Sequence, residues 1–134
     1  MSHLKEKSKF NLDAAEELIT KSLHAPSVHC SYYGCFQFLK YTLKNYRNLT
    51  YEDIEQQCKT YPGGTHGYII DTCLTDVRKK ESSDTHKELK RNIKDLKEFR
   101  VSSDYYNVEI IIDDSEKCLD LSKKIIVQIK KILK

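Results

Sequence analysis

Apolar residues recur at intervals of three and four along most of this chain, which is the spacing of one face of an α-helix. Only four glycines and two prolines interrupt 134 residues, and this scarcity favours helices over a turn-rich β fold. The pattern predicts an all-α protein. We expect residues 1–134 to form a single domain, an up-and-down bundle of four to five helices.

Five segments carry the helical pattern. The proline at 26 disfavours helix at Ala25, so we expect a break there, with Ser27 capping the next helix. Asp113 and Glu116 have the spacing of a capping pair for the last helix. The predicted helices span about 9–22, 28 to about 46, about 65–80, 83 or 84 to between 100 and 105, and 113 onward.

Two connecting segments have a less definite pattern. The linker 47–65 contains the sequence YEDIEQQC, which would form a short helix, and then the breaker Tyr-Pro-Gly-Gly. Residues 106–112 read YNVEIII, and their β-branched content fits either an extended link or a distorted helix end.

The second predicted helix is the most apolar. Three further aromatic residues, Tyr33, Phe36 and Phe38, widen its apolar surface beyond one seam. A helix with so broad an apolar surface lies at the centre of a bundle or faces a second subunit. Its main stripe is Val28, Tyr32, Cys35, Leu39 and Leu43.

An arginine continues the inward stripe of the fourth predicted helix. Leu89, Ile93 and Leu96 form that stripe, and Arg100 follows four residues later. A buried guanidinium needs an acidic partner, a phosphate or an interface, because an isolated buried charge is costly. Asp104, one helical turn further on, is the nearest candidate partner.

Charge narrows the classes of function only slightly. The net charge of +3 permits RNA or nucleotide binding, and residues 78–100 hold nine Lys or Arg against five Asp or Glu, which also fits an ordinary solvated face. No run of 18 apolar residues and no apolar leader occur, so we expect no membrane association and a cytoplasmic location. The five cysteines lie mostly in apolar helical patterns, which predicts buried, reduced thiols.

Few residue patterns suggest chemistry. His24, His29, Cys30 and Cys35 lack the spacing of a metal site, so we expect neither metal nor cofactor. The glycine-rich segment 62–67 opens a helix and its amides could bind an anion, with His66 lining the site, although a flexible connection is the simpler interpretation. No signature of a nucleophilic enzyme occurs.

The order of these motifs resembles the HEPN domain family, small bundles of four or five helices. The likeness covers nearly the whole chain. It includes AAEELI at 14–19 and HAPSVHCSYYGCFQFLKYTL at 24–43, in which Ser31, Tyr32 and Tyr33 match a small residue and tyrosine pair. It also includes FRVSSDYYN at 99–107, which looks like the family's Arg-x-x-x-Asp-Tyr variant.

The resemblance implies a function. Many HEPN proteins are metal-independent endoribonucleases with an arginine, four to six residues and then a histidine, and two such motifs meet in a homodimer. Arg100 matches the arginine, but Tyr105, Tyr106 and Asn107 occupy the histidine positions. An unperturbed tyrosine, with a pKa of about 10, is a poor base at neutral pH.

The resemblance therefore favours a non-catalytic or weakly active module over an enzyme. Such a homodimer, paired through its second and fourth helices, would bind RNA, a nucleotide or a minimal nucleotidyltransferase partner of a toxin–antitoxin or defence system. The expected ligand or interface residues are Arg100, Asp104, Tyr105, Tyr106, Tyr32, Tyr33 and His66. The alternative is an endoribonuclease with an altered site, in which Arg100 acts on the scissile phosphate and Tyr105 assists.

Overall fold

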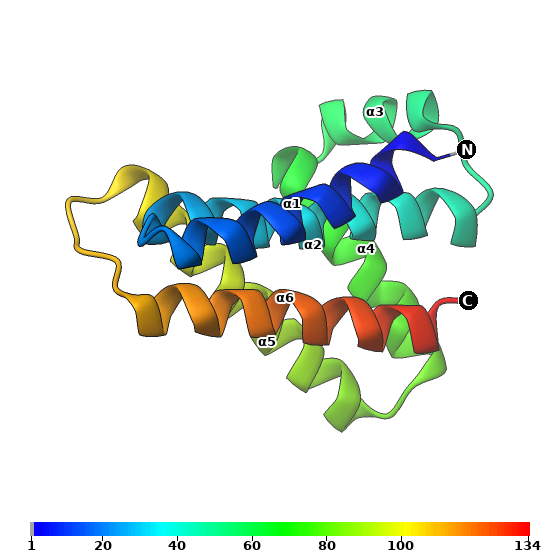
Figure 1. Cartoon of the computed structure of the whole chain (residues 1–134). Helices are drawn as coiled ribbons and strands as arrows, with labels where there is room; N and C mark the ends of the chain where they lie inside the picture. The colour runs from blue at the N-terminus through cyan, green and yellow to red at the C-terminus, as the bar shows by residue number, and fades with distance from the viewer. Residues whose placement is uncertain (1) are drawn as a thin grey trace.

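The computed structural model describes residues 2–134, which form six α-helices and no strand (Figure 1). The all-α prediction is confirmed, but these residues contain one helix more than the upper expectation of five. The helices are α1 (His3–Thr20), α2 (His24–Tyr46), α3 (Tyr51–Thr60), α4 (Gly64–Lys80), α5 (Ser83–Tyr105) and α6 (Ile112–Ile132).

The additional helix is α3, which the sequence left as an optional short segment. Thr50 caps it: the Thr50 hydroxyl accepts from the Asp53 amide at 3.0 Å, and the Asp53 carboxylate accepts from the Thr50 amide at 2.9 Å. Ile54 and Cys58, on its inner face, are buried. Because a ten-residue helix is marginal alone, the capping box and these contacts together stabilise it.

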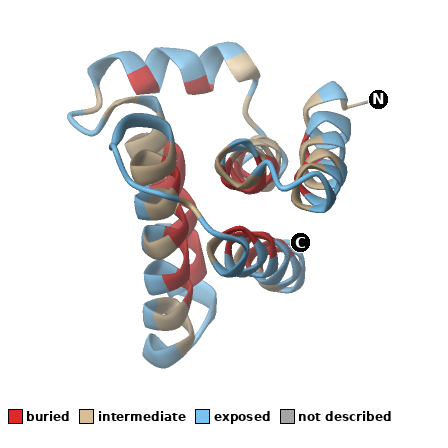
Figure 2. Cartoon of the chain, turned by 60° about the vertical axis from the view of Figure 1, so that its left-hand side comes forward, coloured by how far each residue is buried: buried red, intermediate tan, exposed pale blue. Residues whose placement is uncertain are grey.

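Helix α2 is the centre of the bundle. It contacts α1, α4, α5 and α6, and its predicted stripe is buried. Figure 2 shows the buried sides of the helices turned toward one another. The breadth of its apolar surface is therefore explained by neighbours within the same chain. Phe36 and Phe38 are buried with the stripe, and Tyr33 is partly buried.

The first two helices begin earlier than predicted. Ser2 caps α1 at His3, six residues before the expected start, and α1 ends at Thr20. The expected break at Ala25 was wrong, because α2 begins at His24 and includes Pro26 in its first turn. An amide in the first turn has no partner within the helix, so a proline there loses no hydrogen bond.

Ser27 also differs from its expected role as a cap. Its side chain is fully buried and its hydroxyl donates to the Ala15 carbonyl at 2.8 Å, joining α2 to α1. A second contact of this kind lies further along, where the Ser8 hydroxyl donates to the Gly34 carbonyl at 2.5 Å. A Cβ on Gly34 would lie 2.9 Å from Leu12 Cδ2, so glycine permits this close approach of α1 to α2.

Residues 106–111 are an extended link between α5 and α6. The predicted capping pair, Asp113 with Glu116, was wrong by two positions: Ile111 is the N-cap residue, and its amide donates to the Asp114 carboxylate at 3.1 Å. The carboxylate at Asp114 thus satisfies one of the free amides at the start of α6.

A bidentate ion pair joins the end of α2 to α4. Arg47 Nε and Nη2 donate to the two carboxylate oxygens of Asp76 at 2.9 and 2.8 Å. The Asp76 side chain is 5% exposed, so this pair neutralises a buried charge.

Candidate functional site

Arg100 lies on the buried face of α5, as its place on the stripe predicted. The residue is 8% exposed and follows Leu89, Ile93 and Leu96, all buried. Its guanidinium carbon lies 4.8 Å from the ring centroid of Tyr32, 5.7 Å from that of Tyr33 and 5.9 Å from that of Tyr105. These distances fit cation–π attraction. The three rings form an aromatic wall around the guanidinium.

The polar contacts of Arg100 are incomplete. Asp104 is its nearest carboxylate, as expected, but Nη1 and Oδ2 are 3.8 Å apart, which is too long for a hydrogen bond. Arg100 Nε is buried and has no hydrogen-bond partner. A buried cationic donor without an acceptor is unfavourable. Among residues 2–134, Arg100 therefore keeps an unsatisfied cationic donor, which an anionic ligand or a partner chain would reach by displacing part of the side-chain wall that covers it.

His29 contacts the same aspartate. Its Nδ1 lies 2.9 Å from Asp104 Oδ2, and its ring lies 4.7 Å from the Tyr33 ring. Because a carboxylate only accepts hydrogen bonds, the proton of a neutral His29 sits on Nδ1, which leaves Nε2 as an acceptor. The His29 side chain is 47% exposed, so Nε2 can reach a ligand.

His29 was considered in the sequence only as a metal ligand. It precedes Tyr33 by four residues, so both lie on one face of α2, and that spacing was the available signal. Its contact with Asp104 joins residues 75 positions apart, which no local pattern reveals.

His66 and Tyr32 close the inner side of the site. Tyr32 Oη and His66 Nδ1 are 2.6 Å apart, and the His66 ring stacks on Phe36 at 4.2 Å. Burial, followed by the charges of Arg100 and Lys97, lowers the pKa of His66 to about 4. Burial also raises the pKa of Tyr32, and the charge of Arg100 opposes that shift only partly. Both groups are therefore neutral at pH 7.

We call Arg100, Asp104, His29, Tyr32, Tyr33, Tyr105 and His66 the Arg100 cluster. It includes six of the seven residues expected from the sequence. The seventh, Tyr106, is 61% exposed and lines a separate surface hollow with Lys94, Lys97 and Val101. The glycine-rich segment begins α4 at Gly64, and this start places His66 in the cluster.

The Arg100 cluster combines three functional groups. Arg100 offers a cation with a free donor, Tyr105 is 72% exposed and offers an aromatic face, and His29 offers a proton acceptor. A guanidinium recognises phosphate, and an exposed aromatic ring can stack on a base. Residues 2–134 contain no group of three or more His, Cys, Asp or Glu side chains that could hold a metal ion.

Comparison of the chain with family models, with curated proteins and with solved structures found no match. No helix within residues 2–134 is both long and apolar enough to cross a membrane.

Proposed function

We propose that this protein is a HEPN-like module, non-catalytic or weakly active, that binds RNA or a nucleotide through the Arg100 cluster. The observation that carries the proposal is the buried guanidinium of Arg100, whose Nε has no acceptor. A phosphate oxygen would supply that acceptor and a countercharge. The proposed location is the cytoplasm.

The surroundings of Arg100 support a nucleic-acid ligand over a simple anion. Tyr105 lies within 5.9 Å of the guanidinium and is mostly exposed, so a base can stack on it while its phosphate contacts Arg100. Lys97, on the same helix, adds positive charge near His66. The wall of tyrosines excludes water from one side of the guanidinium, which strengthens its attraction for phosphate.

We also propose that two chains pair at this end of the molecule, around α2 and α5. The loop beside Tyr105 supports a protein contact because it exposes Tyr106, Val108, Ile111 and Ile112. A minimal nucleotidyltransferase of a toxin–antitoxin or defence pair is the other partner that the sequence resemblance suggests. Light scattering of the purified protein at micromolar concentration distinguishes these states: a homodimer has twice the 15.7 kDa chain mass, and a monomer argues against pairing.

Binding of a fluorescently labelled single-stranded RNA, followed by anisotropy, tests the ligand proposal. We expect Arg100→Gln to weaken binding about tenfold or more, because a charge-assisted phosphate contact is lost. Arg91→Gln is the matched control, since Arg91 is exposed on the same helix and the variant has the same net charge. Equal weakening by both variants, or no binding by the unmodified protein, would argue against the proposal.

Endoribonuclease activity is the second candidate, and the His29–Asp104 contact favours it. His29 Nε2 would take the proton of a 2′-hydroxyl, whose oxygen attacks phosphorus while Arg100 holds the phosphate. The bond to the 5′ oxygen breaks, that oxygen takes a proton from solvent, and a 2′,3′-cyclic phosphate remains. In this candidate, His29 of α2 would take the role of the histidine that is absent after Arg100 in the sequence.

Cleavage assays separate this candidate from simple binding. A ribonuclease would cut RNA but not its 2′-deoxy counterpart, and both His29→Gln and Arg100→Gln would abolish cutting while Arg91→Gln would not. RNA that is bound but remains intact supports the non-catalytic module instead.

A further inference from the structure

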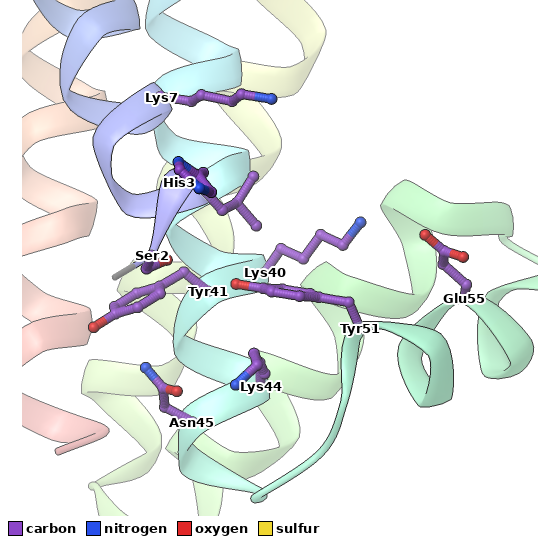
Figure 3. A pocket seen from close by; sticks show the side chains of 10 residues that line it. Ser2, His3, Lys7, Lys40, Tyr41, Lys44, Asn45, Tyr51 and Glu55 are labelled. Carbon is purple, nitrogen blue, oxygen red and sulfur yellow. The ribbon is translucent and has the colours of Figure 1, made fainter.

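A groove lies at the end of α2 opposite the Arg100 cluster, between the start of α1 and α3 (Figure 3). His29 and Lys44 are fifteen residues apart on α2, which places the groove on the order of 22 Å from the Arg100 cluster. Its volume is about 600 Å³, within the usual range for a site that holds a small molecule. The groove is lined by Ser2, His3, Leu4, Lys7, Lys40, Tyr41, Lys44, Asn45, Tyr51 and Glu55.

The lining is strongly cationic. Lys7, Lys40 and Lys44 contribute three ammonium groups, whereas Glu55 is the only carboxylate of the lining. Within residues 2–134, none of these lysines forms an ion pair; those present involve Lys21, His29, Arg47, Arg100, Lys123 and Lys124. Figure 3 shows Lys7 and Lys40 extending toward the same side of the groove. The three ammonium groups therefore outnumber the one carboxylate of the lining, and none of them has an ion-pair partner among residues 2–134.

Tyr51 lies between two of the lysines. Lys40 Nζ and Lys44 Nζ are 5.8 and 5.4 Å from its ring centroid, and Lys5 Nζ is 5.7 Å from that of Tyr41. Lys40 and Lys44 are one helical turn apart, a spacing at which like charges repel. Tyr51 is the first residue of α3, and the Thr50 capping box holds the backbone that carries its ring.

We propose that this groove binds a nucleoside phosphate, its phosphates held by Lys7, Lys40 and Lys44 and its base stacked on Tyr41. Neighbouring ammonium groups attract phosphate as point charges, and a tyrosine ring stacks on any base. A free nucleotide and a nucleotide of an RNA strand share this chemistry. The site uses no residue of the Arg100 cluster, so it can exist whether or not that cluster binds RNA.

Calorimetric titration with ATP tests the site. The full chain carrying Arg100→Gln is used as the background, so that the Arg100 cluster does not contribute. We expect one ATP per chain, and affinity about tenfold or more weaker after Lys40→Gln and Lys44→Gln are added, because two phosphate contacts are lost. Lys87→Gln with Lys90→Gln is the matched control, because both lysines are exposed on α5. We expect the control pair to change affinity less than twofold.

Two further measurements identify the ligand. Tyr41→Leu should weaken ATP binding but leave pyrophosphate binding unchanged, since only the base uses the ring. A uridine oligonucleotide that competes with ATP indicates an RNA strand as the source of the nucleotide. The slope of the logarithm of its binding constant against the logarithm of salt concentration should then fall in magnitude by about 1.4 when both lysines are replaced. An oligonucleotide that fails to compete indicates a free nucleotide.

The proposal is overturned if the background protein binds neither ATP nor the oligonucleotide, or if the groove and control pairs weaken binding equally. Circular dichroism at 222 nm verifies that each variant is folded. ATP binding that persists in the Arg100→Gln background supports the groove even if the Arg100 cluster binds no RNA. The two proposals can therefore fail independently.

Discussion

Replacement of the two aspartate-paired arginines should have very different consequences for stability. Arg47 and Arg100 each pair with an aspartate, but Arg47 makes two short hydrogen bonds to Asp76, whereas Arg100 lies 3.8 Å from Asp104. If Arg100 serves ligand binding rather than folding, its replacement should change the free energy of unfolding only slightly. Arg47 should be essential to the fold.

The magnitudes follow from the contacts. Arg100→Met loses an i,i+4 ion pair of about 0.3–0.5 kcal/mol and cation–π attraction of about 1–2 kcal/mol. It also removes a buried cationic donor without an acceptor, which relieves about 1–3 kcal/mol. Asp104 keeps its bond to His29, so no new unpaired group results. We expect the free energy of unfolding to change by less than about 1 kcal/mol.

Arg47→Met instead leaves the buried carboxylate of Asp76 without its partner. This should cost about 3–5 kcal/mol of unfolding free energy. Urea denaturation followed by circular dichroism at 222 nm measures both variants, because the chain is helical and has no tryptophan. With a slope of about 1.5 kcal/mol per molar urea, the two midpoints should differ by about 2 M. Equal losses in the two variants would refute the distinction and make Arg100 a structural residue.

Three other expectations concern the fold. Gly34→Ala should lose about 1–3 kcal/mol of stability in urea, despite better helix propensity, because its Cβ meets Leu12 at 2.9 Å. The folded-state pKa of His66, about 4, lies below the unfolded value of about 6.5, so His66 stabilises the fold above pH 6.5 and this contribution is lost as pH falls toward 4. After allowance for solvent screening the loss is about 1–2 kcal/mol, and unfolding across that pH range should show it in the unmodified protein but not in His66→Gln. Native protein treated with a thiol reagent should react quickly only at Cys30, since the other four cysteines are buried, and rapid modification of a second thiol would contradict this packing.

The buried residues of the bundle could be predicted from the helical spacing of apolar residues in the sequence. Val28 to Leu43 and Leu89 to Arg100 follow the helical spacing, and all members of both stripes are buried. The same spacing predicted that Arg100 is buried. Asp104, one helical turn further on, was predicted as its nearest acidic partner, and it is the nearest carboxylate in the structure. These predictions succeeded because side chains three and four residues apart share a helix face whatever the rest of the fold does.

Helix starts and distant contacts were harder to predict. The preference of a residue before proline for extended backbone did not prevent helix at Ala25, because Pro26 lies in the first turn, where a proline loses no hydrogen bond within the helix. Helix α6 is capped at Ile111, with Asp114 accepting from its amide, because the chain leaves the extended link two residues earlier than the acidic pair suggested. His29 joined the Arg100 cluster only through packing of α2 against α5, which depends on three-dimensional arrangement.

The most direct test of the central proposal follows the Arg100 Nε–H group by nuclear magnetic resonance. The chain has four arginines, so the four Nε–H signals can be assigned with single Arg→Lys variants. Addition of single-stranded RNA should shift the Arg100 signal downfield as its unpartnered donor gains a phosphate acceptor, while the signal of exposed Arg91 stays in place. An unchanged Arg100 signal at RNA concentrations that saturate binding would contradict the proposal.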